Sequence, residues 1–132
     1  MKRIILVLGC LAYLVAEAAD RPVVTYLDSP RDFPGAQAFK DKESGITFYV
    51  ESDGRHVAAL NAEGKILWHR DPFVEAKLEP YRFERPVIVF IGQPHPTSIE
   101  DRKGKFIAIS FNSSQFGILD VATGNFTFLG ND

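Results

Sequence analysis

Three histidines and one aspartate are the residues of this sequence best suited to holding a metal ion: His56, His69, Asp71 and His95. Imidazole nitrogens and carboxylate oxygens together ligate zinc and related divalent ions. The strand register that the neighbouring turns predict places His56 and His69 on opposite faces of one sheet. Asp71 precedes a proline and is expected to cap a helix. We therefore expect no metal site.

The sequence contains no familiar catalytic motif. It lacks the GxSxG and HExxH patterns, a phosphate-binding loop and a dinucleotide fingerprint. A charged segment around Tyr81 is expected to be a solvated helix and linker; it comprises Glu75, Glu79, Arg82, Glu84 and Arg85. We expect no catalytic residues and no bound cofactor. The alternative is a small hydrolase that uses histidine and glutamate, which clustering of His95 and Glu100 with a third polar group in one pocket would favour.

A polar loop from Gln93 to Arg102 is the expected interaction surface. Long loops on rigid β scaffolds often carry binding residues. The candidate contact residues are His95, Thr97, Glu100, Asp101 and Arg102. The spacing of Thr97 and Glu100 also fits a helix capping box. An ordinary connection between two sheet units is the alternative interpretation of this loop.

Residues 1–19 have the pattern of a secretory signal peptide. The basic pair Lys2-Arg3 precedes an apolar stretch that ends at Ala16, and small residues follow. This stretch is shorter than the roughly 20 residues that a membrane-spanning helix needs. We expect cleavage after Ala18 or Ala19, and export of residues 20–132 as a single domain to the bacterial periplasm or the medium.

Cys10 is the only cysteine and lies within the expected signal peptide. Its removal would exclude disulfides, thiolate metal ligands and a cysteine nucleophile, which fits a bacterial envelope protein. The alternative is a lipoprotein signal, Val7-Leu8-Gly9-Cys10, with a lipid on the cysteine. The 15 basic residues are neither in excess over the 17 acidic ones nor clustered, so no nucleic-acid partner is expected.

The elements that would position these residues are mainly antiparallel strands. A β-meander is predicted for residues 46–70, with strands at 46–51, 56–60 and 66–70. Three-residue hairpin loops closed by glycine would place Glu51 opposite Arg55. The second loop would likewise place Asn61 opposite Lys65. The core face in this register collects Ile46, Phe48, Val50, Ala58, Leu60, Ile66 and Trp68.

Other elements flank this meander. A strand is predicted at 20–27, and a loop at 28–45 with a helical turn at Ala36–Phe39. A short helix is predicted near 72–78, because Asp71 is a good N-cap and Pro72 suits the first helical position. The continuous apolar run at 87–91 predicts a central strand that is covered on both faces.

A second meander completes residues 87–129. Its further strands are expected at 106–111, 115–120 and 125–129. One face collects Ile107, Ile109, Phe111, Leu119, Phe126 and Phe128. The two meanders lie about 60 residues apart, with Gly64 and Gly124 in equivalent turns, so we expect an internal duplication.

Both units contain an apolar strand, a turn with Asp or Asn closed by glycine, and then a large aromatic residue. The segments are 59–68, which ends in Trp68, and 119–128, which has Phe128 in the tryptophan's place. This pattern resembles the blades of PQQ-type β-propellers over about 50 residues. The resemblance implies that the aromatic side chain docks on the neighbouring unit. A closed propeller needs four or more blades, so the quinone cofactor is not carried over.

These patterns predict an all-β, mainly antiparallel protein. Two blade-like meanders would pack as a small sandwich or as part of a propeller. The function expected is an exported, non-catalytic binding module for a protein or glycan partner. A homo-oligomeric β ring, in which several copies complete the propeller, is a further alternative.

Overall fold

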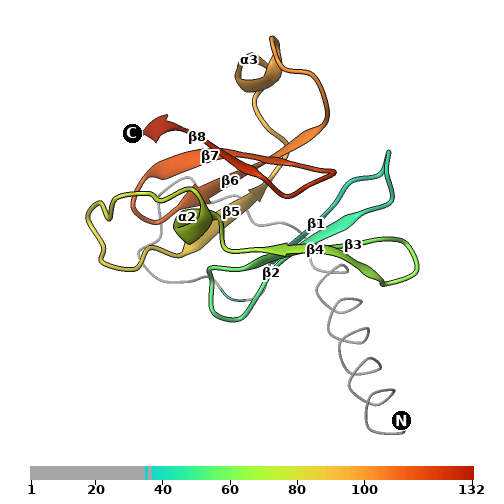
Figure 1. Ribbon diagram of the computed structural model, residues 1–132, viewed down its shortest axis with the longest axis horizontal. Helices are drawn as coiled ribbons and strands as arrows, with labels where there is room; N and C mark the ends of the chain where they lie inside the picture. The colour runs from blue at the N-terminus through green and yellow to red at the C-terminus, as the bar shows by residue number, and fades with distance from the viewer. Residues whose placement is uncertain (1–34, 36) are drawn as a thin grey trace, which may run out of the picture.

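The computed structural model of this chain describes Gly35 and residues 37–132 (Figure 1). The predicted signal peptide and the strand predicted at 20–27 lie outside these residues. The first four strands are β1 (Gln37–Lys40), β2 (Thr47–Val50), β3 (Val57–Leu60) and β4 (Ile66–Arg70). The other elements are α2 (Pro72–Glu75), β5 (Ile88–Gly92), α3 (Pro96–Ile99), β6 (Phe106–Phe111), β7 (Gln115–Asp120) and β8 (Phe126–Asn131).

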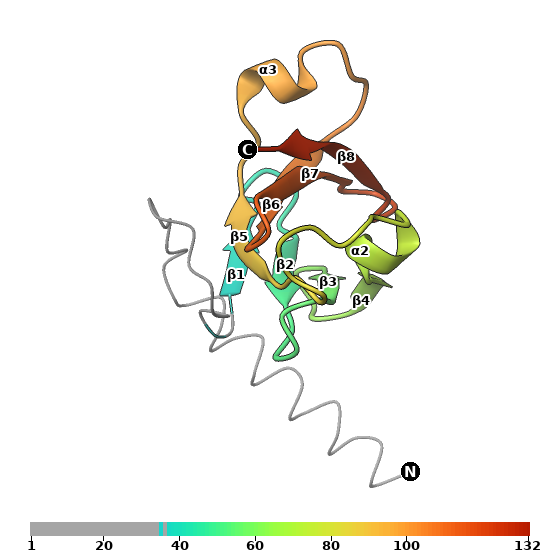
Figure 2. The same cartoon turned by 90° about the vertical axis from the view of Figure 1, so that its left-hand side faces the viewer.

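The strands form two four-stranded antiparallel sheets in the orders β1-β2-β3-β4 and β5-β6-β7-β8. The sheets pack on each other through one core cluster, to which both contribute (Figure 2). The largest fully buried side chains in it include Phe48, Ile91 and Phe111. This confirms the predicted all-β sandwich, with only two short helices in the described part of the chain. Neither of these helices is long and apolar enough to cross a membrane.

The register of the first hairpin differs from the prediction by one residue. Val50 pairs with Val57, and the Glu51 N–H donates to the carbonyl of His56 at 2.9 Å. Glu51 therefore lies opposite His56 and not opposite Arg55, and the loop contains four residues. Its Asp53 carboxylate accepts hydrogen bonds from the backbone N–H groups of Arg55 and His56. These bonds stabilise the longer loop, as Asp commonly does in turns.

The second hairpin begins in the predicted register and then changes it. The Asn61 N–H donates to the carbonyl of Lys65, as predicted, and Leu60 pairs with Ile66. Ala59 pairs with Trp68, so a β-bulge accommodates one extra residue, Leu67, in β4.

Together, the longer first loop and the bulge at Leu67 reverse which side chains of β3 point into the core. The central cluster contains Val57 and Ala59, whereas Ala58 and Leu60 were predicted there. Ile66, also predicted in the core, is 47% exposed. The physical reason is that side chains alternate along a strand, so a shift of one residue reverses their direction.

Two other predicted segments flank the first meander. The segment predicted as a loop with a helical turn at Ala36–Phe39 contains strand β1, because it pairs with β2 over Gln37–Lys40. The helix predicted near 72–78 begins as predicted, with the Asp71 carboxylate accepting from the Val74 N–H at 3.2 Å and Pro72 as its first residue, but it ends at Glu75.

β5 is buried, as its apolar run predicted, but it is the outer strand of its sheet and not a central one. It lies beside β1 of the other sheet (Figure 2). The Gln37 side chain of β1 donates to the carbonyl of Ile88 at 3.3 Å. A strand of the other sheet therefore covers the edge of β5 that has no pairing partner within its own sheet.

The second sheet keeps most of its predicted core face. Ile107, Ile109, Phe111 and Leu119 are buried, and Phe126 packs against the cluster. Phe128 is the exception, with 42% of its surface exposed. It pairs with Gly117 beside a bulge in β8, where Leu129 is the extra residue.

Candidate functional site

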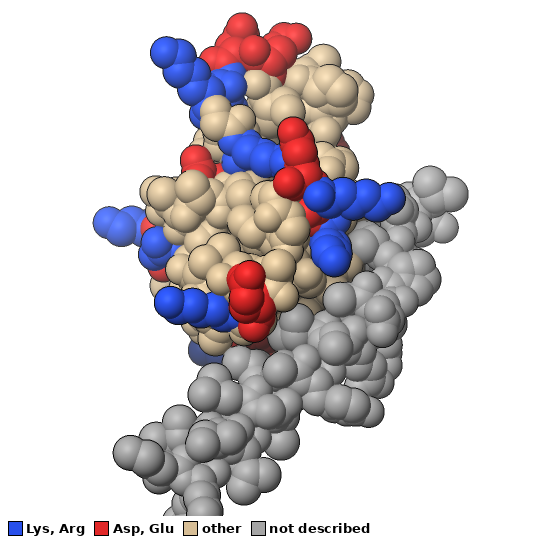
Figure 3. Space-filling view, turned by 90° about the vertical axis from the view of Figure 1, so that its right-hand side faces the viewer, with Lys and Arg blue, Asp and Glu red and all other residues tan. Residues whose placement is uncertain are grey.

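The predicted interaction loop projects from the second sheet between β5 and β6 and carries α3 at its end (Figures 1 and 2). All five candidate residues, His95, Thr97, Glu100, Asp101 and Arg102, are exposed. On the face drawn in Figure 3, basic and acidic side chains lie next to each other, including at the projecting end. The structure therefore places the five residues on one accessible loop and leaves them outside the core.

Local hydrogen bonds order this loop. The His95 ring accepts from the Thr97 N–H at 3.3 Å and makes His95 the N-cap of α3, so the predicted Thr97–Glu100 capping box is wrong. His95 Nδ1 also lies 2.8 Å from the Thr97 hydroxyl. The Arg102 side chain donates to the carbonyl of Ser98 at 3.2 Å. Among the described residues, no hydrogen bond or ion pair joins His95 to Glu100.

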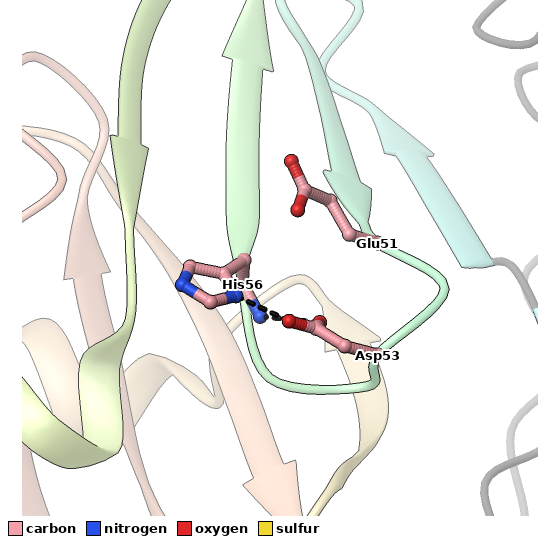
Figure 4. A group of neighbouring side chains, drawn as sticks. All are labelled: Glu51, Asp53 and His56. Carbon is pink, nitrogen blue, oxygen red and sulfur yellow. Dashed lines mark hydrogen bonds and ion pairs between the residues drawn. The ribbon is translucent and has the colours of Figure 1, made fainter.

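A second group of polar residues lies on the first sheet, on the face turned away from the core. Glu51 directly follows β2, Asp53 occupies the turn after it, and His56 precedes β3. His69 comes from β4, directly opposite Ala58. Asp71 follows β4 as the N-cap of α2. We call these five residues the His56 cluster; Figure 4 shows three of them.

The side chains of the His56 cluster contact one another in a chain. His69 Nε2 lies 2.7 Å from Glu51 Oε1, and His56 Nδ1 contacts the Asp53 carboxylate (Figure 4). The other ring nitrogen of His56 lies 3.8 Å from Asp71 Oδ2. The two imidazole rings stack in parallel, with centroids 4.9 Å apart and planes 1° apart.

The pKa values of two members reflect this geometry. Burial raises the pKa of Asp53, but hydrogen bonds from the backbone of Arg55 and His56 and from the His56 ring outweigh it and lower the pKa to about 2. The hydrogen bond to Asp53 raises the pKa of His56, and the charges of Asp71 and Glu51 add to this effect. Three carboxylates around two imidazoles thus make a local centre of negative charge, which favours a bound cation.

The prediction that His56 and His69 lie on opposite faces is wrong. His69 was predicted on the outer face and His56 on the core face. The four-residue loop moves His56 to the outer face, and the bulge at Leu67 keeps His69 there although β3 is reversed. Asp71 caps α2 through one carboxylate oxygen and faces His56 with the other. It can therefore cap the helix and interact with His56 at the same time. His95, the remaining candidate ligand, contacts Thr97 on the α3 loop and is not a member of the cluster.

Glu51 and Asp53, which also belong to this cluster, were not predicted as candidate ligands. The available signal was the spacing of Asp53 and His56, since an Asp in a turn accepts hydrogen bonds from the residues that follow it. One group of side chains that could hold a metal ion occurs among the described residues: Glu51, Asp53 and His56. Comparisons with protein families, with curated proteins and with solved structures find no match for this chain.

Proposed function

We propose that this chain is an exported binding module that contacts a protein or glycan partner without catalysing a reaction. The observation that carries the proposal is the α3 loop, which is exposed and projects from a rigid β sandwich. Rigid scaffolds with ordered, accessible loops lose little conformational entropy when they bind. The bacterial periplasm or the medium is the proposed location, on the pattern of residues 1–19.

The charges of the loop suit contact with a polar surface. Glu100 and Asp101 are followed directly by Arg102 and Lys103, and all four are exposed. Charges of both signs within a few residues favour one orientation of a partner over others. Specificity is therefore the expected contribution of this segment.

Site-specific photo-crosslinking in the producing cells tests the loop. Thr97 would be replaced by a photoreactive amino acid in one variant, and the exposed Glu63 of the β3–β4 turn in a control variant. We expect a discrete crosslinked species from the Thr97 position alone. No crosslink at Thr97, or the same product from both positions, would contradict the proposal.

A second candidate function is a β ring made of several copies. It is supported by the different exposure of the two corresponding aromatic side chains, Trp68 and Phe128. Trp68 in the first unit is buried and its indole N–H donates to Val121 of the second unit at 2.8 Å. Phe128 has the corresponding place in the second unit and is 42% exposed. In a ring of blade-like units, the first unit of another copy would cover Phe128, and the assembly would be a closed symmetric oligomer.

A further inference from the structure

The turn between β2 and β3 brings three potential metal ligands close together. One ligand atom each from Glu51, Asp53 and His56 lies within 4.8 Å of the other two (Figure 4). On a tetrahedral ion with bonds of about 2.0–2.2 Å, neighbouring ligand atoms are about 3.3–3.6 Å apart. The side chains of Asp53 and His56 are each about one-third exposed, 37% and 34%. Binding one ion therefore requires the three ligand atoms to move closer together, and the exposure of the side chains leaves room for such a rotation.

A fourth group comes from the neighbouring strand. His69 Nε2 already lies 2.7 Å from the Glu51 carboxylate. Its ring stacks on that of His56 with a centroid distance of 4.9 Å. His69 is not part of the group of three whose ligand atoms lie within 4.8 Å of one another, so its ring must rotate out of the stacked position to reach the same ion.

We propose that this face binds one divalent transition-metal ion, for which Zn²⁺ is the probe, through four side chains: Glu51, Asp53, His56 and His69. Two imidazoles and two carboxylates form a mixed nitrogen and oxygen ligand set that suits zinc and its neighbours. Mg²⁺ and Ca²⁺ prefer sites built from oxygen ligands alone. The site therefore selects a transition metal over these two ions.

Asp71 lies outside the proposed ligand group and faces the second ring nitrogen of His56. Histidines that bind metals commonly donate their second ring N–H to a carboxylate, which holds the ring in orientation. Asp71 Oδ2 lies 3.8 Å from His56 Nε2, on the side of the ring away from Asp53. Its other oxygen accepts from the Val74 N–H, so α2 holds the carboxylate in place. Asp71 thus acts as a positioning residue and not as a ligand.

The proposal is independent of the α3 loop and of any partner that binds there. Its test is an isothermal titration of the purified, untagged chain with ZnCl₂, repeated in the presence of excess Mg²⁺. We expect one Zn²⁺ per chain and little competition from Mg²⁺. Titration with Co²⁺ should give the visible absorption bands of a tetrahedral ion that is bound by nitrogen and oxygen.

Variants separate ligand loss from loss of fold. His56→Ala and His69→Ala should each weaken Zn²⁺ binding by about 10-fold or more, and Asp71→Asn by about 10–100-fold. Asn caps helices as well as Asp does, so Asp71→Asn keeps α2. Asp53→Asn likewise keeps an oxygen acceptor for the turn and removes the charge. His95→Ala is the matched control, since it removes a histidine that lies on the α3 loop.

Circular dichroism of each variant would verify its fold. The proposal is overturned if Zn²⁺ does not bind, or if binding is unchanged in folded His56→Ala and His69→Ala proteins. It is equally overturned if His95→Ala weakens binding as much as they do. Unchanged affinity in Asp71→Asn would overturn the positioning role alone.

Discussion

The indole N–H of Trp68, at the centre of β4, donates a 2.8 Å hydrogen bond to the backbone carbonyl of Val121, in the turn between β7 and β8 of the other sheet. The same ring packs 5.8 Å from the ring of Phe48. Trp68 thus couples the two sheets through this hydrogen bond and packs against Phe48 of β2 within its own sheet. It is one of the residues through which the two sheets contact each other.

Replacing Trp68 with Phe should destabilise the protein. The substitution removes the N–H donor and leaves the Val121 carbonyl with no donor from the indole, which costs about 1–3 kcal/mol in a buried setting. The measurement is the free energy of unfolding in urea. Leu67→Ala, at the adjacent and half-exposed bulge position, should change that free energy by about 0.5 kcal/mol or less. Equal effects of the two substitutions would contradict the coupling role.

The two equivalent turn glycines, Gly64 and Gly124, provide a matched pair. Their φ angles are +80° and +77°, so alanine at either position costs about 1–2 kcal/mol in the left-handed region. A Cβ at Gly124 would also lie 2.6 Å from the Trp68 ring, whereas nothing lies within 4 Å at Gly64. Gly124→Ala should therefore destabilise by about 1–3 kcal/mol more than Gly64→Ala. Urea unfolding of both variants checks this, and similar losses would show that the ring can move aside.

An ion pair between the sheets should make the free energy of unfolding depend on pH. Lys105 Nζ lies 2.8 Å from the buried Asp41 carboxylate. Burial raises the pKa of Asp41, but hydrogen bonds from Lys105 and Ser44 outweigh it, and the pKa lies below its ordinary value. A lowered pKa means that the carboxylate stabilises the fold above the unfolded-state pKa of about 3.9 and loses this effect as the pH falls through the folded-state pKa.

Asp41→Asn should accordingly lower the melting temperature at neutral pH, and the difference from the natural protein should shrink below about pH 4. Melting curves by circular dichroism across this range provide the measurement. Glu43→Gln is the control, because Glu43 contacts the same Lys105 at 2.6 Å with a side chain that is 85% exposed. Its effect should stay within about 0.5 kcal/mol at every pH. A deficit in Asp41→Asn that is independent of pH would contradict the ionic explanation.

The oligomeric state distinguishes the ring from the isolated module. If the ring proposal holds, size exclusion with light scattering should give one discrete symmetric oligomer. Phe128→Ser should then dissociate it, because Phe128 would lie in the interface between copies. Val74→Ser removes another exposed apolar side chain, 66% exposed, and should leave the mass unchanged. A monomer would overturn the ring and leave the single binding module.

Much of the local structure could be predicted from short stretches of sequence. The strands of both meanders follow from alternating or continuous apolar residues, and α2 follows from Asp71 and Pro72. These signals depend on neighbours within a few residues, which is why pattern and structure agree there. β1 escaped prediction because only its pairing with β2 makes Gln37–Lys40 a strand.

The His56 cluster could not be predicted in the same way. Val57, Ala58, Ala59 and Leu60 are all apolar, so either face of β3 could have formed the core. In the structure, Val57 and Ala59 pack in the core cluster together with Phe48 and Trp68. His56 and His69 reach the same outer face as a consequence.

By itself, the sequence determined the all-β class, the turn glycines and the capped helix, because each depends on local backbone preferences and apolar spacing. Only the tertiary structure decided which face of β3 is buried, which residues surround His56, and which aromatic side chain is covered by the other unit. Those outcomes depend on one extra residue in a loop and one in a bulge. Such a residue changes local energy little, yet it reverses every side chain that follows it along the strand.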